Sequence, residues 1–247
     1  QGDWSSDVCS SDLNDDNENL RKQTINVLEE VALAKKDEVE ALLIKISKED
    51  QSSLVRANAL AGLGTYYNDS LHSDIYAEAL NDSSYMVMYN GLVFLSKVNS
   101  KKAIYHANLL KGETNKLMIR GLIEVFGTHG DDTAHEYFID ASKKISGYGK
   151  YSFIPSYVDY LSRNNSVNNL KKAIPILKSF SGGDYFNQFY NMQLSSLSSA
   201  IEKEQNVVAT KLQQQEDSDE KLKLEELNAE LNEIKKELDE FIKELNG

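Results

Sequence analysis

Apolar residues recur at intervals of three and four along most of this chain, the spacing that places side chains on one face of an α-helix. Two of these stripes are formed by Leu54, Val55, Leu60 and Leu63 and by Met86, Val87, Leu92 and Leu95. Asn, Asp and Ser separate the stripes, and their side-chain oxygens accept the free backbone N–H groups at helix starts. A sustained alternation with a period of two, typical of strands, is missing. The pattern predicts an all-α chain of helix hairpins.

The stripes also resemble one another at a fixed distance along the chain. A shift of 32 residues places Val55, Asn58, Ala59, Leu60 and Leu63 on Val87, Asn90, Gly91, Leu92 and Leu95. A further shift of 30 places Gly121, Leu122 and Val125 on the last small and apolar positions of that set. A two-helix repeat of this length is the signature of an α-solenoid. We predict a HEAT-like α-solenoid over residues 14–204, with an irregular helical bundle as the alternative. The small residues are expected to let neighbouring helices approach closely.

The C-terminal segment has an apolar pattern of its own. Its apolar positions alternate at three and four over three heptads, and they are Leu224, Leu227, Leu231, Ile234, Leu238, Phe241 and Leu245. We predict a long amphipathic helix over residues 221–247, preceded by a polar linker or helix continuation over residues 205–220. This helix either caps the open end of the solenoid, against helices around Leu194, or forms an intermolecular coiled coil. The second arrangement makes 221–247 a self-association segment.

The first residues of the chain are interpreted as an artefact. Residues 3–13 read Asp-Trp-Ser-Ser-Asp-Val-Cys-Ser-Ser-Asp-Leu, and one reading frame of a widely used sequencing-library adapter encodes all of them in this order. We therefore expect residues 1–13 to be adapter-derived and not structural, and the true N-terminus to be missing. The only tryptophan and the only cysteine fall in this segment, so disulfides and cysteine-ligated metals are not expected in the remainder.

The charge is concentrated at the C-terminal end. The net charge of −12 becomes −9 without the three aspartates of residues 1–13. Residues 216–247 carry twelve acidic and five basic side chains, a net of −7, which leaves −2 for residues 14–215. A near-neutral body with an acidic end argues against nucleic acid as a partner. No apolar run is long enough for a membrane span, and the compartment stays open.

One short string resembles part of a metallopeptidase motif. His135-Glu136 begins a match to His-Glu-x-x-His, in which two imidazoles one helical turn apart bind zinc. Ile139 occupies the second histidine position and cannot be a ligand. The neighbouring Asp131 and Asp132 are better explained as helix-capping residues. We predict no catalytic, cofactor-binding or metal-binding residue in this chain.

Aromatic residues are concentrated between residues 148 and 190. They include Tyr148, Tyr151, Phe153, Phe189 and Tyr190. Such rings could line a peptide-binding wall, because they offer a large contact area with hydrogen-bonding tips. Alternatively they fill the core where the repeats become irregular, which is the interpretation we favour.

The repeat helices resemble those of a known enzyme family. The segments 53–63, 82–99 and 150–161 are similar to helices in the C-terminal helical region of bacterial zinc aminopeptidases of the alanyl aminopeptidase and leukotriene hydrolase family. In that family the zinc lies in an upstream catalytic domain with His-Glu-x-x-His, a distal glutamate ligand and Gly-x-Met-Glu-Asn. None of these elements occurs in this chain.

The resemblance implies a non-catalytic role. The chain would be the C-terminal helical domain of a truncated zinc aminopeptidase, closing the active site and shaping the peptide channel. Its partners would be the missing N-terminal catalytic domain, where zinc is expected, and the peptide substrate of the parent enzyme. The alternative is a free-standing HEAT-like scaffold that binds a protein partner.

Overall fold

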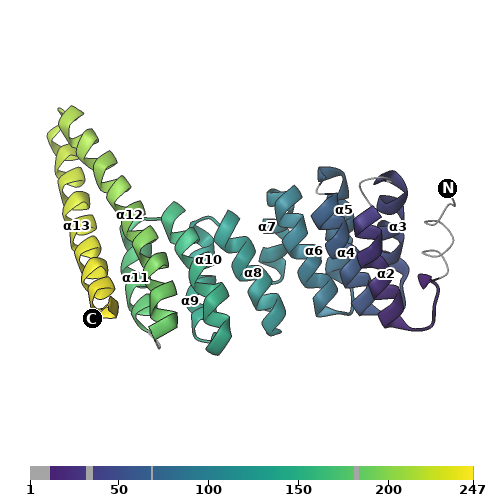
Figure 1. The fold of residues 1–247 in the computed structure, drawn as a ribbon. Coiled ribbons are helices and arrows are strands. Elements are labelled where there is room, and N and C mark those ends of the chain that lie inside the picture. Colours follow the sequence, from purple (N-terminus) through teal and green to yellow (C-terminus); the bar gives the residue numbers. More distant parts are fainter. Residues whose placement is uncertain (1–11, 32–35, 68, 181–183, 247) are drawn as a thin grey trace. The chain divides into compact units, whose positions relative to one another are not determined.

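The computed structural model describes residues 12–31, 36–67, 69–180 and 184–246 (Figure 1). These residues form helices joined by short turns, and none of them is in a strand. The chain divides into two compact units, residues 1–125 and residues 126–247, which are described separately below. The prediction of an all-α, HEAT-like solenoid of helix hairpins with a long amphipathic C-terminal helix is confirmed.

The first unit is a stack of helix pairs. Its elements are α2 (Glu18–Val31), α3 (Lys36–Glu49), α4 (Ser53–Tyr66), η1 (Ser70–His72), α5 (Ser73–Glu78), η2 (Ala79–Asn81), α6 (Tyr85–Val98), α7 (Ser100–Leu109) and the first part of α8 (Lys116–His129). The first helices of successive pairs pack side by side, α2 on α4 and α4 on α6. The second helices α3 and α5 pack against α4 and α6, the first helices of the following pairs. Each pair therefore packs against the next pair along the chain, as in a repeat protein.

The small residues of the repeat lie where helices meet most closely, as predicted. Ala59 is fully buried. A Cβ atom on Gly91 would lie 2.7 Å from the backbone oxygen of Tyr76 and 3.0 Å from Cβ of Ala79. A Cβ atom on Gly121 would meet the Tyr89 ring at 3.0 Å. The backbone of α6 thus approaches the preceding pair at a distance that a larger residue at position 91 would prevent.

Two arginine–aspartate pairs join successive repeats in a way the apolar pattern did not reveal. The guanidinium of Arg21 donates to both carboxylate oxygens of Asp50, at 2.9 and 3.0 Å. Arg56 donates to both oxygens of Asp82, each at 2.8 Å. Each arginine also donates to backbone oxygens before its own helix, Asp15 and Asp50 respectively. Bidentate pairs of this kind fix geometry as well as adding energy, so they set the register between neighbouring pairs.

The second unit contains five α-helices among its described residues. Its elements are η3 (Asp132–Ala134), α9 (His135–Ser142), η4 (Gly147–Gly149), α10 (Lys150–Arg163), α11 (Val167–Lys178), α12 (Asp184–Gln214) and α13 (Ser218–Asn246). Helix α10 packs on α12, and α11 packs on α9 and α13. Lysines on α11 link it to both neighbours, because Lys172 pairs with Glu136 at 2.8 Å and Lys171 with Glu230 at 2.6 Å.

The C-terminal helix α13 lies along α12 of the same chain. Leu231, Ile234, Leu238 and Phe241 are buried. Helix α13 packs on α12, and the Phe241 ring contacts that of Tyr190, with centroids 6.2 Å apart. Ser198 of α12 donates to Asp239 of α13 at 2.6 Å. The apolar seam of α13 is therefore occupied by its own chain in this structure. Helix α12 continues to Gln214, within the segment that was expected to be a linker or helix continuation.

Two sequence predictions concern the ends and the surroundings of the chain. Residues 1–13 were interpreted as adapter-derived, and residues 1–11 of this segment lie outside the described residues. No described helix is long and apolar enough to cross a membrane.

Candidate protein-binding surface

The aromatic residues between 148 and 190 divide into a buried set and an exposed set, both in the second unit. The buried set comprises Phe153, Tyr157, Tyr160, Phe180, Phe186 and Tyr190. In contrast, Tyr148 and Tyr185 are each 91% exposed, and Tyr151 is 43% exposed. The core-filling interpretation therefore applies to the first set only.

Two residues of the buried set, Tyr157 and Tyr160, contact His135, the residue considered above as a zinc ligand. The His135 ring nitrogen Nε2 lies 2.9 Å from the hydroxyl of Tyr157, and its ring stacks on Tyr160. Burial and the nearby Lys172 lower the pKa of His135 below its usual value. Burial raises the pKa of Tyr160 to about 12. His135 is thus a packed core histidine, and no cluster of three or more His, Cys, Asp or Glu among the described residues could hold a metal ion.

The exposed tyrosines, the half-buried Phe189 and the exposed Met192 make up what we call the aromatic patch: Tyr148, Tyr151, Tyr185, Phe189 and Met192. The Tyr148 and Tyr151 rings are stacked, with centroids 6.3 Å apart. The Tyr151 ring lies 5.2 Å from that of Phe189, which links η4 and α10 to α12. Met192 is 63% exposed.

Local sequence explains why these side chains face outwards. Gly147 has a φ of 55°, a backbone conformation that favours glycine, and it starts the short η4 helix that carries Tyr148. On α12, Tyr185, Phe189 and Met192 have the spacing i, i+4 and i+7, which places them on one helix face. Phe186 and Tyr190 are offset by one residue and are buried. One helix therefore supplies both the core and the patch.

Positive charge flanks the aromatic patch. The segment 143–150 contains three lysines and no acidic residue. The ammonium of Lys150 lies 5.4 Å from the ring centroid of Phe186 and 5.6 Å from that of Phe180, within the range of cation–π attraction. The segment that carries Tyr148 is therefore rich in lysine, whereas Asp184 precedes Tyr185 on α12, and the net charge of the chain is −12.

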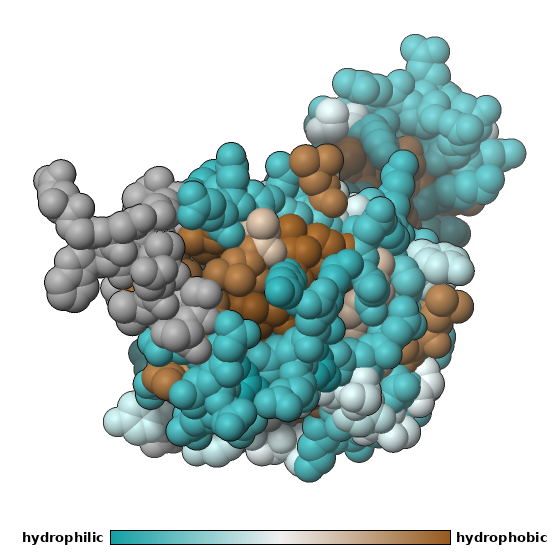
Figure 2. All heavy atoms as spheres, turned by 90° about the vertical axis from the view of Figure 1, so that its right-hand side faces the viewer, coloured by the Kyte–Doolittle hydropathy of each residue, from teal (hydrophilic) through white to brown (hydrophobic). Residues whose placement is uncertain are grey.

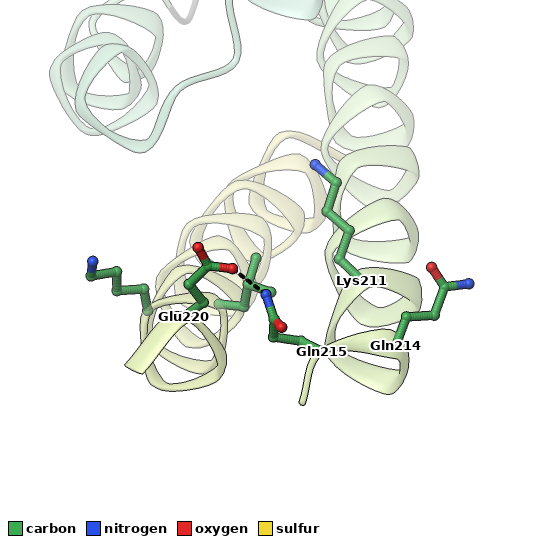
Figure 3. A pocket seen from close by; sticks show the side chains of 6 residues that line it. Lys211, Gln214, Gln215 and Glu220 are labelled. Atoms are coloured by element: carbon green, nitrogen blue, oxygen red, sulfur yellow. Dashed lines mark hydrogen bonds between the residues drawn. The ribbon is translucent and has the colours of Figure 1, made fainter. Parts of the chain in front are cut away.

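A cavity of about 510 Å³ lies at the turn between α12 and α13 (Figure 3). Lys211 and Gln214 project from α12, and Gln215 donates a hydrogen bond to Glu220 at the start of α13. Its remaining lining residues are Lys223 and Leu224. The lining has no nucleophile beside a general base, so it offers no evident reaction chemistry. A smaller cavity of about 270 Å³ in the first unit is lined in part by the Lys48–Glu78 ion pair.

A second apolar surface lies on the first unit. Figure 2 shows hydrophobic side chains gathered on one face of the described residues. Val27 of α2 is 48% exposed. The aromatic patch differs from this surface because Tyr148, Tyr151 and Phe189 are joined by ring contacts.

No protein-family model matches the chain, and no curated protein matches it. A search of solved structures finds a chain of the complex of CpcE and CpcF of phycocyanin lyase from Nostoc sp. PCC7120. That chain is 14% identical, and the alignment covers 91% of this chain and 93% of that chain with a TM-score of 0.47. At this identity and TM-score the similarity gives no information on the activity or partners of this chain.

The predicted relationship to the C-terminal region of a zinc aminopeptidase is wrong. No family model and no curated protein supports an aminopeptidase, and a solved structure that does match belongs to the complex of CpcE and CpcF of phycocyanin lyase. The residues that carried the resemblance, such as Val55, Leu92 and Tyr157, are buried. Their pattern reflects how repeat helices pack, and unrelated helical repeats have the same pattern of buried apolar positions. The role in closing a peptide channel, and the missing catalytic domain as partner, lose their basis with it.

Proposed function

We propose that this chain is a helical-repeat scaffold that binds a protein partner through the aromatic patch. The observation that carries the proposal is the exposure of Tyr148 and Tyr185, each 91%, beside further rings in contact with one another. Soluble chains seldom leave such rings grouped on the surface without a partner. Tyrosine is also enriched among the residues that dominate binding energy at protein interfaces.

The patch has the construction of an interface core. Tyr151 and Phe189 contact each other and the buried Phe186, so their rings are held in place before a partner arrives. Rigid rings lose little conformational entropy on binding. Each Tyr or Phe ring buries about 150 to 250 Å² when it is fully covered. A few such rings give a compact apolar centre for an interface.

Photo-crosslinking tests the proposal in the cells that make the protein. Benzoylphenylalanine replaces Tyr185 in one variant and Tyr105 in a control variant. Tyr105 of α7 is also exposed, at 62%, and it belongs to the first unit. We expect one protein to crosslink through position 185 and not through position 105.

The captured protein must then bind in purified form. Saturable 1:1 binding that weakens at least about tenfold when Tyr148 and Tyr151 are both changed to alanine supports the proposal. Crosslinks of equal pattern from positions 185 and 105, or binding that the double change leaves unaltered, would refute it.

A further inference from the structure

The lysines beside the aromatic patch differ in their ion pairs from the lysines of α11. Lys171, Lys172 and Lys178 of α11 each pair with a glutamate at 2.6 to 2.8 Å. Among the side chains that the structure describes, no carboxylate forms an ion pair with Lys150 or with Lys144. These two lysines lie on either side of Tyr148 in the sequence. The lysines of α11 are thus paired, whereas Lys150 forms no ion pair with a described carboxylate and Lys144 has only the electrostatic attraction of Asp140, whose pKa it helps to lower.

Aromatic rings hold the Lys150 ammonium in place. It lies over the Phe180 and Phe186 rings at 5.6 and 5.4 Å, and both rings are buried. Phe186 in turn contacts Tyr151 at 5.4 Å, so the cation and the exposed rings are parts of one arrangement. A fixed cation next to an apolar surface is suited to a ligand that carries both a carboxylate and an apolar side chain.

We infer that the partner segment bound by the aromatic patch is an acidic peptide segment with an aromatic or large aliphatic side chain. The inference rests on the proposed function and specifies its partner. The apolar side chain packs on the Tyr151 and Phe189 rings, and carboxylates of the same segment approach Lys150 and Lys144.

The charge of the whole chain favours a peptide over a polyanion such as nucleic acid. The net charge of −12 repels a long polyanion, whose binding needs an extended basic surface. Lys144 and Lys150 provide a local attraction that a short acidic segment can use, whereas Lys143 is paired with Asp140 at 2.8 Å. The negative charge of the rest of the chain repels an acidic peptide and so limits its binding elsewhere. This repulsion favours binding of the peptide at the patch.

Selection from a random dodecapeptide library displayed on phage tests the inference with the full chain. We expect the enriched peptides to be acidic and to contain at least one aromatic or large aliphatic residue. Changing Lys144 and Lys150 to glutamate is expected to remove the acidic bias. The same change at Lys101, an exposed lysine of α7, is the matched control and is expected to preserve it.

A synthetic copy of the strongest peptide then gives the affinity by fluorescence anisotropy. We expect Lys150→Gln to weaken binding about tenfold, and added salt to weaken it further, because salt screens exposed charges. Lys144→Glu alone changes an exposed residue and gives a second test if position 150 affects folding. Thermal unfolding of each variant identifies any that fails to fold.

The outcomes separate the inference from the proposed function. Enriched peptides that are neutral or basic but still depend on Tyr148 and Tyr151 overturn the acidic partner and leave the patch as a binding surface. Enrichment that depends on neither tyrosine contradicts both. A selection with no enrichment overturns the inference, whereas the crosslinking experiment decides the proposed function independently.

Discussion

Shortening a leucine on the buried seam of α13 should destabilise the second unit strongly. Leu231 and Leu238 are each 1% exposed, whereas Leu222 of the same helix is 56% exposed. Leu→Ala at a buried site loses the transfer free energy of the side chain and leaves a cavity, at a cost of about 2 to 4 kcal/mol. Leu222→Ala makes the same chemical change and should cost less than about 0.5 kcal/mol, as surface changes do.

Hydrogen exchange followed by mass spectrometry measures this cost locally. A loss of 2 to 4 kcal/mol corresponds to exchange of the α13 amides that is roughly 30- to 700-fold faster. The change should not depend on protein concentration, because α13 packs on α12 and α11 of the same chain. The reasoning fails if Leu231→Ala and Leu238→Ala cost no more than Leu222→Ala. It also fails if sedimentation shows an oligomer that becomes monomeric when residues 216–247 are removed.

Three further predictions address packing and titration. Gly91→Ala should lower the free energy of unfolding, measured in urea, by about 1 to 2 kcal/mol, because the added Cβ would lie 2.7 Å from a backbone oxygen and overpacking outweighs the gain in helix propensity. In the control Gly121→Ala, the added Cβ meets the edge of the Tyr89 ring, which can move, so this variant should not be destabilised. The folded pKa of His135 is lowered, mainly by burial, so its contribution is full above the unfolded pKa of about 6.5 and declines as pH falls below it; His135→Gln should lack this part of the pH dependence of unfolding. The hydrogen bond from Arg56 lowers the folded pKa of Asp82. The wild type should therefore have a larger free energy of unfolding than Asp82→Asn above about pH 4, and this difference should disappear as pH falls further. A constant difference down to the acid transition would contradict that assignment.

The helices and their stacking could be predicted because they depend on short-range periodicity. The spacing of Val55, Leu60 and Leu63, repeated 32 residues later, is sufficient to identify two amphipathic helices and their repeat. Gly91 was identified as a close-approach position for the same reason, since it occupies the position of Ala59. These signals lie within one repeat and need no knowledge of which helices meet.

Contacts between repeats could not be predicted in the same way. Arg21 and Asp50 are 29 residues apart, and Arg56 and Asp82 are 26 apart. Their pairing depends on the register between two helix pairs, which apolar periodicity alone does not determine. The signal available in the sequence was that an Arg, at 21 and again at 56, is followed by an Asp about one repeat later, at 50 and 82.

The candidate surface was only half visible in the sequence for a related reason. Phe186 and Phe189 are both aromatic residues of α12, yet the first is 8% exposed and the second belongs to the patch. A shift of three positions on a helix changes which neighbour a side chain meets, and that neighbour is set by how α10 packs on α12. The family resemblance failed because it rested on buried packing residues, which determine how helices pack and do not identify an activity.

The affinity of the crosslinked partner for single alanine variants of the patch is the most direct test of the account. Isothermal titration with the purified partner compares Tyr148→Ala and Tyr185→Ala with the control Tyr105→Ala. The account predicts that at least one patch variant loses about 2 kcal/mol or more, roughly a 30-fold weaker Kd, while the control stays within about twofold of wild type. Equal affinities for all three variants would show that the exposed tyrosines of the second unit are not a binding surface.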